Sequence, residues 1–344
     1  MLLIFFFVFI SGILINYFVV KNYDNLNLNI LLDKEYSKPQ SFHKRPVLCF
    51  GGPSIYILFL LIFLLFDLKF LNHFFLLATI SFFVGLLDDL KIKLKPFLRL
   101  MLIITLFFAS IKFLNIDINY LNVNFLNEVF KDYYYLKLFF VTLCFVFIIN
   151  GSNFIDGFNG LLTIHAFIIL SIVNFINYYF SNYDLLIFGV ISQSVIISFA
   201  FFNFPKAKLF LGDSGSYLIG TLLSYLIIQT SNYNPNIPSF FFCCLLYYLF
   251  FEVFFSFIRK LFYEKKNPLI PDKNHLHMLF FSRIVKKVKF SNSNFSTGLY
   301  LNVIYMLTLL PAFYFYNNIY FLKYYFFILL IIYFLYYCSL RKYK

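Results

Sequence analysis

The sequence predicts an all-α integral membrane protein, and three observations lead to that prediction. Hydrophobic residues make up 62% of the chain and charged residues only 12%, a balance that does not suit a single water-soluble core. The apolar residues also fall in long continuous runs, and a membrane-spanning helix needs about 20 such residues. A membrane β-barrel would instead show segments of about ten residues in which apolar and polar residues alternate, and the runs lack this pattern. We therefore expect a bundle of helices that crosses a lipid bilayer.

Eleven apolar runs qualify as spans, with ten as the alternative count. The first run lacks a basic n-region and is not followed by a small-residue cleavage pattern, so it is expected to be an anchor and not a removable signal peptide. The expected spans are residues 1–20, 47–66, 71–87, 97–114, 136–150, 161–180, 185–203, 215–230, 239–258, 298–317 and 319–338.

The distribution of charge predicts the orientation of the bundle. If all eleven runs span the membrane, one side receives 23 of the 28 Lys and Arg residues. Basic residues are in excess in cytoplasmic loops, so this side is expected to be cytoplasmic, with the N-terminus outside and the C-terminus inside. The net charge of +13 then follows from topology and anionic lipid head groups, and no nucleic-acid partner is needed. The expected inner loops are 21–46, 88–96, 151–160, 204–214 and 259–297.

One polytopic domain is expected to cover residues 1–344, with the inner loops forming its active-site face. The sequence shows no internal repeat and no soluble nucleic-acid-binding domain. Its five cysteines lie in or beside apolar runs without C-x-x-C spacing. This pattern favours buried packing residues over a disulfide framework or a zinc site.

Four polar segments interrupt the apolar chain, all on the expected inner side, and the first is the pair Asp88 and Asp89. Two adjacent carboxylates repel each other unless a cation or a proton is near, and Lys95 and Arg99 follow them. One interpretation is a solvated helix end. The other is a site for Mg²⁺ or for a phosphate nucleophile, and charge so close to the hydrocarbon favours it.

The second and third segments combine carboxylates, amides and small residues. The segment NFIDGFNG places Asn153, Asp156 and Asn159 three residues apart, on one face if the segment is helical. Its glycines allow the backbone to approach a ligand closely. The segment GDSGS places Asp213 in a turn of small residues. Mg²⁺ is usually bound by few carboxylates together with substrate phosphates and water, so Asp213 is a candidate ligand. The alternative is that Asp213 only caps the helix that follows.

The fourth segment, PDKNHLH, lies in a basic inner loop that begins near Arg259. It contains Asp272 and two histidines, His275 and His277, which can lie on one side of an extended segment. The lack of Cys or further carboxylate ligands argues against zinc. Phosphate contact, or proton handling near neutral pH, suits imidazoles beside basic residues better.

In order and spacing, these motifs resemble those of the polyprenyl-phosphate N-acetylhexosamine-1-phosphate transferases, glycosyltransferase family 4, which includes the phospho-muramoyl-pentapeptide translocase. The resemblance covers nearly the whole chain. It runs through His43-Lys44-Arg45 with Gly51-Gly52, Asp88-Asp89, Lys95-Pro96 with Arg99, NGSNFIDGFNGL, NFPKAKLFLGDSGS, Glu252 before Arg259-Lys260, and PDKNHLH.

The resemblance implies transfer of a sugar 1-phosphate from a UDP-N-acetylhexosamine to undecaprenyl phosphate, with release of UMP, at the cytoplasmic face of the plasma membrane. It implies Mg²⁺, or alternatively Mn²⁺, bound by Asp213 and Asn153. The implied catalytic residues are Asp88, Asp89, Asp156 and His275. The implied substrate-binding residues are Asn159, Lys95, Arg99, Asp272, His277, Lys44 and Arg259.

Three positions depart from the family pattern and bear on sugar preference and activity. Asn159 stands where many members have Asp, Met278 where many have His, and Glu252 where Asp is common. A homodimer and the glycan pathway, whether O-antigen, teichoic acid or similar, stay open.

Two other classes of function compete with the transferase. A transporter or flippase of lipid-linked sugars usually has its charged site near the bilayer midplane and is often built from repeated halves. The four polar segments lie at one interface instead. An inactive scaffold of a glycan-assembly complex is the second rival, and the retained aspartates argue against it.

Overall fold

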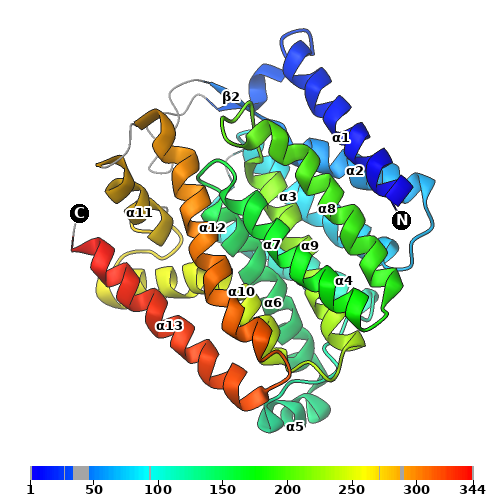
Figure 1. The fold of residues 1–344 in the computed structure, drawn as a ribbon, viewed down its shortest axis with the longest axis vertical. Helices are drawn as coiled ribbons and strands as arrows, with labels where there is room; N and C mark the ends of the chain where they lie inside the picture. Colours follow the sequence, from blue (N-terminus) through cyan, green and yellow to red (C-terminus); the bar gives the residue numbers. More distant parts are fainter. Residues whose placement is uncertain are drawn as a thin grey trace.

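The computed structural model describes residues 2–26, 28–33, 46–92, 94–270, 272–286 and 290–342, and its architecture is a bundle of helices (Figure 1). The helices are α1 (Leu2–Asn22), α2 (Gly51–Leu65), α3 (Leu71–Asp89), α4 (Pro96–Phe113), α5 (Asn124–Asp132), α6 (Tyr134–Ile155), α7 (Leu161–Tyr179), α8 (Tyr183–Asn203), α9 (Gly212–Tyr233), α10 (Ser239–Ile258), α11 (Leu276–Val285), α12 (Phe290–Tyr314) and α13 (Ile319–Arg341). A 3₁₀ turn, η1 (Leu28–Leu31), and a π-helical turn, η2 (Arg259–Tyr263), complete the helical elements. Lys44 lies outside the described residues.

Nine helices in the described part of the chain are long and apolar enough to cross a membrane. They are α1, α3, α4, α6, α7, α8, α10 with η2, α12 and α13. The other two expected spans are also helices, but α2 has only 15 residues and α9 is not among the apolar spans. The all-α, multi-pass architecture is confirmed, whereas the count of eleven and the orientation stay predictions.

The central helix of the bundle is α9, and its position explains its composition. It packs against α2, α3, α6 and α7, and every residue from Ser214 to Ile228 is buried. Small residues permit these close contacts: a Cβ at Gly220 would lie 2.6 Å from Cα of Ile149 in α6. Because protein and not lipid surrounds α9, the helix needs no apolar outer surface.

A small sheet ties together the segments that precede α2 and α9. Its three strands are β1 (Leu32–Asp33), β2 (Val47–Cys49) and β3 (Leu209–Phe210). The central strand β2 runs antiparallel to β1 and parallel to β3, with Leu48 opposite both Leu32 and Leu209. The backbone N–H of Gly52 also donates to the carbonyl oxygen of Leu211 at 2.9 Å. The first turns of α2 and α9 are therefore fixed at the same end of the bundle.

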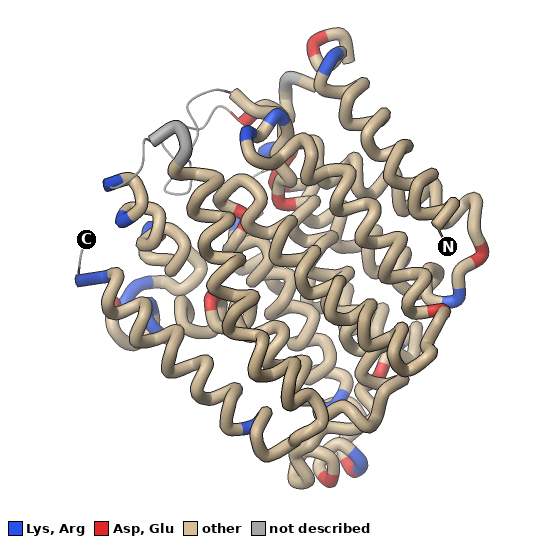
Figure 2. The backbone as a smooth tube through the Cα atoms, in the orientation of Figure 1, with Lys and Arg blue, Asp and Glu red and all other residues tan. Residues whose placement is uncertain are grey.

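The two ends of the bundle differ in charge. Figure 2 shows Lys and Arg around α11 and the C-terminal end of α13, and near β2. At the opposite end lies the short helix α5, within the expected outer loop 115–135, and basic and acidic residues are mixed there (Figures 1 and 2).

Candidate active site

The carboxylate of Asp89 caps the N-terminus of α9. Its Oδ1 accepts a hydrogen bond from the backbone N–H of Asp213 at 2.8 Å. Its Oδ2 accepts from the backbone N–H of Ser214 at 3.0 Å and from the Ser214 hydroxyl at 2.5 Å. Backbone N–H groups in the first turn of a helix have no partner within the helix, and the helix dipole favours a negative charge there. Asp89 thus joins the end of α3 to the start of α9, and both its oxygens are engaged.

Two glycines permit this contact between α3 and α9. Gly212 has φ of +72°, and a Cβ at this position would lie 2.7 Å from the carboxylate oxygens of Asp89. A Cβ at Gly85 would lie 2.5 Å from Cα of Ser214. Only glycine avoids both the strain of the left-handed region and the steric clash. The segment GDSGS therefore begins with glycine because a neighbouring helix lies directly against it.

The guanidinium of Arg99, in the first turn of α4, lies between two carboxylates. Its Nη1 contacts Oδ2 of Asp88 and is 3.3 Å from Oδ2 of Asp213. The Asp213 side chain is 38% exposed, against 18% for Asp88, so Asp213 is the more accessible of the two to a ligand. Lys95, which precedes α4, is exposed.

Asn153 and Asp156 approach the same region from α6. The Asn153 amide donates to the hydroxyl of Ser216 at 3.1 Å, and that hydroxyl donates to the backbone carbonyl of Asp213 at 3.1 Å. Asp156 directly follows α6 and keeps some solvent access. Burial raises the pKa of Asp156 well above its usual value, and the negative charges of Asp213 and Asp89 raise it further. These carboxylates are therefore close enough to influence one another.

Asn159 has a different role in this structure. Its side-chain amide donates to the backbone carbonyl of Pro205 at 3.0 Å. The backbone N–H of the next residue, Gly160, donates to Oδ1 of Asn203 at 2.7 Å. The two bonds hold the loop after α6 against the end of α8 and the loop that follows it. A substrate contact by Asn159 stays a prediction.

The buried carboxylate of Glu252, in α10, faces both histidines of the fourth polar segment. Its Oε2 is 3.0 Å from Nδ1 of His275, and its Oε1 is 3.6 Å from Nδ1 of His277. The two imidazole rings lie nearly parallel, with centroids 5.5 Å apart. Nε2 of His275 is 3.5 Å from Oδ1 of Asp272. The sequence resemblance included Glu252 but gave it no role; a lone carboxylate in an apolar run was the available signal.

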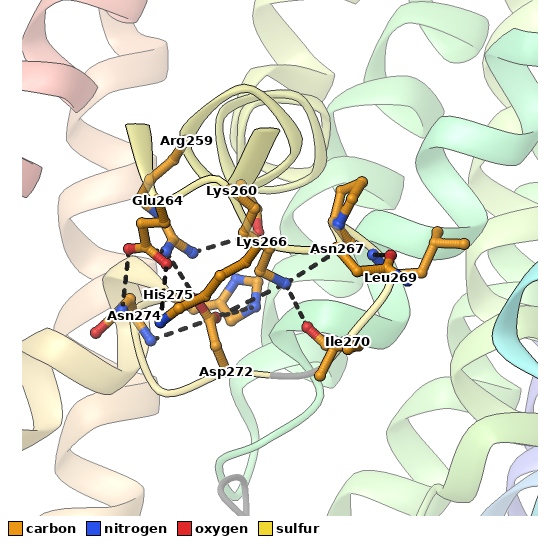
Figure 3. Close-up of polar contacts among 12 residues, drawn as sticks. Arg259, Lys260, Glu264, Lys266, Asn267, Leu269, Ile270, Asp272, Asn274 and His275 are labelled. Atoms are coloured by element: carbon orange, nitrogen blue, oxygen red, sulfur yellow. Dashed lines mark hydrogen bonds and ion pairs between the residues drawn. The ribbon is translucent and has the colours of Figure 1, made fainter. Parts of the chain in front are cut away.

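Arg259 and Asp272 pair with each other and hold the loop after α10 (Figure 3). Nη1 of Arg259 is 2.7 Å from Oδ2 of Asp272 and 2.7 Å from Oε1 of Glu264. Nζ of Lys260 donates to the backbone carbonyl of Ile270 at 2.8 Å. Burial alone would raise the pKa of Asp272, but the hydrogen bond from Arg259 and the charge of His275 lower it below its usual value. With its side chain only 2% exposed, Arg259 holds the loop, and substrate contacts by Arg259 and Asp272 stay predictions.

The histidines meet the second polar segment at Gly157. A Cβ at Gly157 would lie 3.9 Å from Nε2 of His277. On either side of this glycine, the ring of Phe154 packs edge-on against His275 and the ring of Phe158 packs edge-on against His277. All four polar segments predicted from the sequence thus come together at one end of the bundle.

The side chains of this region suit a metal ion that takes only one or two ligands from the protein. Among the residues that the structure describes, no group of three or more His, Cys, Asp or Glu side chains is arranged to hold a metal. Mg²⁺ is commonly bound by one or two carboxylates, with water and substrate phosphates as its other ligands. The accessible carboxylate of Asp213, with the amide of Asn153 one helix away, fits such a site.

Comparison with known proteins finds relatives that belong to one family of transferases. The model of glycosyl transferase family 4 matches residues 71–231, which run from the start of α3 almost to the end of α9. The chain is 30% identical over 246 residues to an undecaprenyl-phosphate alpha-N-acetylglucosaminyl 1-phosphate transferase of Thermotoga maritima, covering 71% of each chain. It is 29% identical over 136 residues to a probable undecaprenyl-phosphate N-acetylglucosaminyl 1-phosphate transferase of Bacillus subtilis, covering 38% of this chain and 36% of the relative. A phospho-N-acetylmuramoyl-pentapeptide-transferase of Leuconostoc mesenteroides subsp. mesenteroides is 36% identical over 75 residues, 22% of this chain and 23% of the relative.

Proposed function

The chain belongs to glycosyl transferase family 4, and we propose from this that it transfers an N-acetylhexosamine 1-phosphate from a UDP-sugar to undecaprenyl phosphate, releasing UMP. The observation that supports the proposal most directly is the meeting of four polar segments at one end of an apolar helix bundle. Such a site lies at the boundary between lipid and water, where a lipid phosphate and a soluble nucleotide sugar can meet.

The reaction exchanges one phosphorus–oxygen bond for another. An oxygen of the lipid phosphate attacks the β-phosphorus of the UDP-sugar, and the bond from that phosphorus to the bridging oxygen breaks, so that UMP leaves with the electron pair. A phosphate monoester has a second pKa of about 6 and is largely dianionic at pH 7. The nucleophile therefore needs positioning and charge neutralisation more than it needs a base.

We assign the residues of the site to these tasks. Asp213, with Asn153, would bind Mg²⁺ or Mn²⁺, and the ion would supply positive charge to the diphosphate. Asp89 fixes the first turn of α9 and so positions Asp213. Asp88 holds the guanidinium of Arg99, which would offer its positive charge to a phosphate.

The remaining predicted residues would act at the edges of the site. Asp156 would face the reacting groups from the end of α6. Lys95, which is exposed, would attract the anionic substrates, and by family resemblance we give Lys44 the same task. We place the site at the cytoplasmic face of the plasma membrane, where the enzyme would begin a cell-envelope polysaccharide.

A transfer assay with purified protein tests this proposal. Undecaprenyl phosphate, Mg²⁺ and UDP-GlcNAc or UDP-GalNAc labelled in the sugar are expected to give labelled lipid and free UMP. The variant Asp213→Asn is expected to lower turnover by on the order of a hundredfold, because it removes charge beside the diphosphate.

The matched control is Asp117→Asn, at the opposite end of the bundle, where Asp117 pairs with Lys137 at 2.5 Å. This variant is expected to retain wild-type turnover. Release of UDP instead of UMP would mean that only the sugar moves and would overturn the mechanism. Full turnover by Asp213→Asn would remove the metal assignment.

A further inference from the structure

Glu252 and His277 form a buried pair whose polar atoms are not all hydrogen-bonded within the described part of the chain. The side chains are 1% and 0% exposed. Among the residues that the structure describes, Oε1 of Glu252 and both ring nitrogens of His277 have no partner within hydrogen-bond distance. Buried polar groups are nearly always hydrogen-bonded, because an unmade bond costs stability. Oε1 of Glu252 and Nδ1 of His277 face each other at 3.6 Å, so Nε2 of His277 is the atom of the pair that points to an added group.

The two histidines differ in this respect. His275 has a carboxylate at each ring nitrogen, with Glu252 3.0 Å from Nδ1 and Asp272 3.5 Å from Nε2. Its ring is therefore held from both sides. For His277, the described residues place a carboxylate on the Nδ1 side alone, where Oε1 of Glu252 lies 3.6 Å away. Its Nε2 is the nitrogen that remains available for a ligand.

The carboxylate of Glu252 also decides which nitrogen of His277 carries the proton. An ionised carboxylate only accepts hydrogen bonds, so a neutral imidazole facing it carries its hydrogen on the nearer nitrogen. For His277 this nitrogen is Nδ1. Burial lowers the pKa of His277 below its usual value, although Glu252 opposes the shift, and the ring is therefore neutral at pH 7. Its Nε2 then presents a lone pair and no hydrogen.

Nε2 of His277 lies beside Gly157. A Cβ at Gly157 would lie in ordinary contact with His277, 3.9 Å from Nε2 and 4.0 Å from Cδ2. Gly157 directly follows Asp156, whose pKa responds to the charges of Asp213 and Asp89. A ligand group that enters beside this glycine is therefore close to the carboxylates of the site.

We propose that Glu252 is a positioning residue that holds His277 in its Nδ1–H form, so that Nε2 accepts a hydrogen bond from a hydroxyl or amide N–H of the UDP-sugar beside Gly157. The identity of the ligand rests on the proposed function. The assignment differs from phosphate binding, because an Nε2 without hydrogen cannot donate to a phosphate oxygen. It also makes His277 the ligand-binding ring and His275 its support, whereas the family resemblance assigned catalysis to His275.

The tautomer is tested without substrate, by nitrogen NMR of protein labelled in its histidines. The signal that disappears in His277→Gln is expected to show Nδ1–H in the wild type. Glu252→Gln turns an amide NH₂ toward one of the two rings and is expected to convert one of them to Nε2–H. The exposed His73 serves as the control, because His73→Gln is expected to leave the other signals unchanged. A wild-type His277 with its hydrogen on Nε2 would overturn the proposal.

The ligand is tested by measuring the affinities for UDP-GlcNAc and for UMP. Glu252→Gln is expected to weaken UDP-GlcNAc binding about three- to tenfold, the effect of one lost neutral hydrogen bond. Unchanged UMP affinity would assign the donor to the sugar, and an equal loss for UMP would assign it to the nucleoside. Glu252→Asp, which keeps the acceptor, is expected to recover part of the affinity.

Gly157→Ala keeps Glu252 and His277 intact and covers the case in which Glu252 variants do not fold. Its methyl group fills the space beside Nε2 at contact distance, so the variant is expected to fold and to lose UDP-GlcNAc affinity to a similar degree. Wild-type affinity in both Glu252→Gln and Gly157→Ala would overturn the ligand role. If the wild type binds neither nucleotide, both the proposed function and the ligand assigned to His277 are wrong. The NMR spectra test the tautomer of His277 independently of that result.

Discussion

At the scale of single residues, the carboxylate of Asp89 is engaged entirely with the start of a neighbouring helix. Both its oxygens bind the first turn of α9, and one of their partners is the backbone N–H of Asp213 itself. The adjacent Asp88 faces Arg99 instead. Neighbours in the sequence thus have separate tasks, one fixing a helix and the other a cation, and neither task can be read from the dipeptide alone.

Gly212 is expected to be the least replaceable glycine of this contact. Gly212→Ala places a Cβ 2.7 Å from the carboxylate of Asp89 and forces alanine into a left-handed conformation. The variant is expected to be less stable by about 1–3 kcal/mol and to show a lower Tm in detergent solution. Gly157→Ala, whose Cβ would meet His277 only at 3.9 Å, is the control and is expected to change stability by less than about 0.5 kcal/mol. Equal Tm values for the two variants would contradict this account.

At the scale of elements, the segment after α10 is held by charges more than by regular structure. It begins with the π-helical turn η2, and π-helical turns are frequent at functional sites. Arg259 then binds Glu264 and Asp272, which fixes the chain that leads to His275 (Figure 3). An ion-pair network of this kind sets the position of the histidines and makes the loop sensitive to acid.

The acid sensitivity has a definite sign. The pKa of Asp272 is lower in the folded protein than its ordinary 3.8, so its ion pair stabilises the fold above about pH 4 and loses this effect as the pH falls through the folded pKa. Asp272→Asn is therefore expected to lower the Tm at pH 7, and the difference from wild type is expected to shrink below about pH 4. Thermal unfolding between pH 7 and pH 3 measures this.

The exposed Asp24→Asn is the control for that series and is expected to leave the Tm at pH 7 unchanged. Two results would count against the ion pair: wild-type stability of Asp272→Asn at pH 7, or a difference from wild type that persists undiminished at pH 3.

At the scale of the whole molecule, the chain is a multi-pass membrane protein with its polar segments at one end. Basic residues around α11, at the C-terminal end of α13 and near β2 mark that end (Figure 2). The positive-inside rule then predicts that this end faces the cytoplasm. The short helix α5, at the other end, is expected to face outward.

Cysteine labelling tests this orientation in cells. In a variant whose five native cysteines are replaced, Lys131→Cys in α5 is expected to react with a membrane-impermeant maleimide in intact cells. Lys206→Cys, in the loop before β3, is expected to react only after the membrane is permeabilised. The opposite pattern would show that the bundle is inverted.

The sequence predicted the fold and the gathering of polar segments because membrane hydropathy and turn chemistry are local properties. The expected span 215–230 became α9, for example, although small residues make it one of the least apolar of the set. The side-chain contacts within the site could not be predicted from the sequence. Glu252 and His275 are separated by 23 positions and meet only through the packing of α10 against the chain that follows it. The same reasoning applies to Arg259 and Asp272. Each was expected to contact substrate, and the two form an ion pair with each other.

The protein-lined position of α9 also has a consequence for the order in which the enzyme is made. A helix with Gly, Ser and Thr along its length gains little by entering lipid alone, so its insertion depends on partners that are already in the membrane. Its principal neighbours α3 and α6 precede it in the chain and leave the ribosome first. The centre of the enzyme is thus expected to be completed late, when α9 enters a groove that earlier helices have prepared, and only then does Asp89 acquire the backbone donors that bring Asp213 into place.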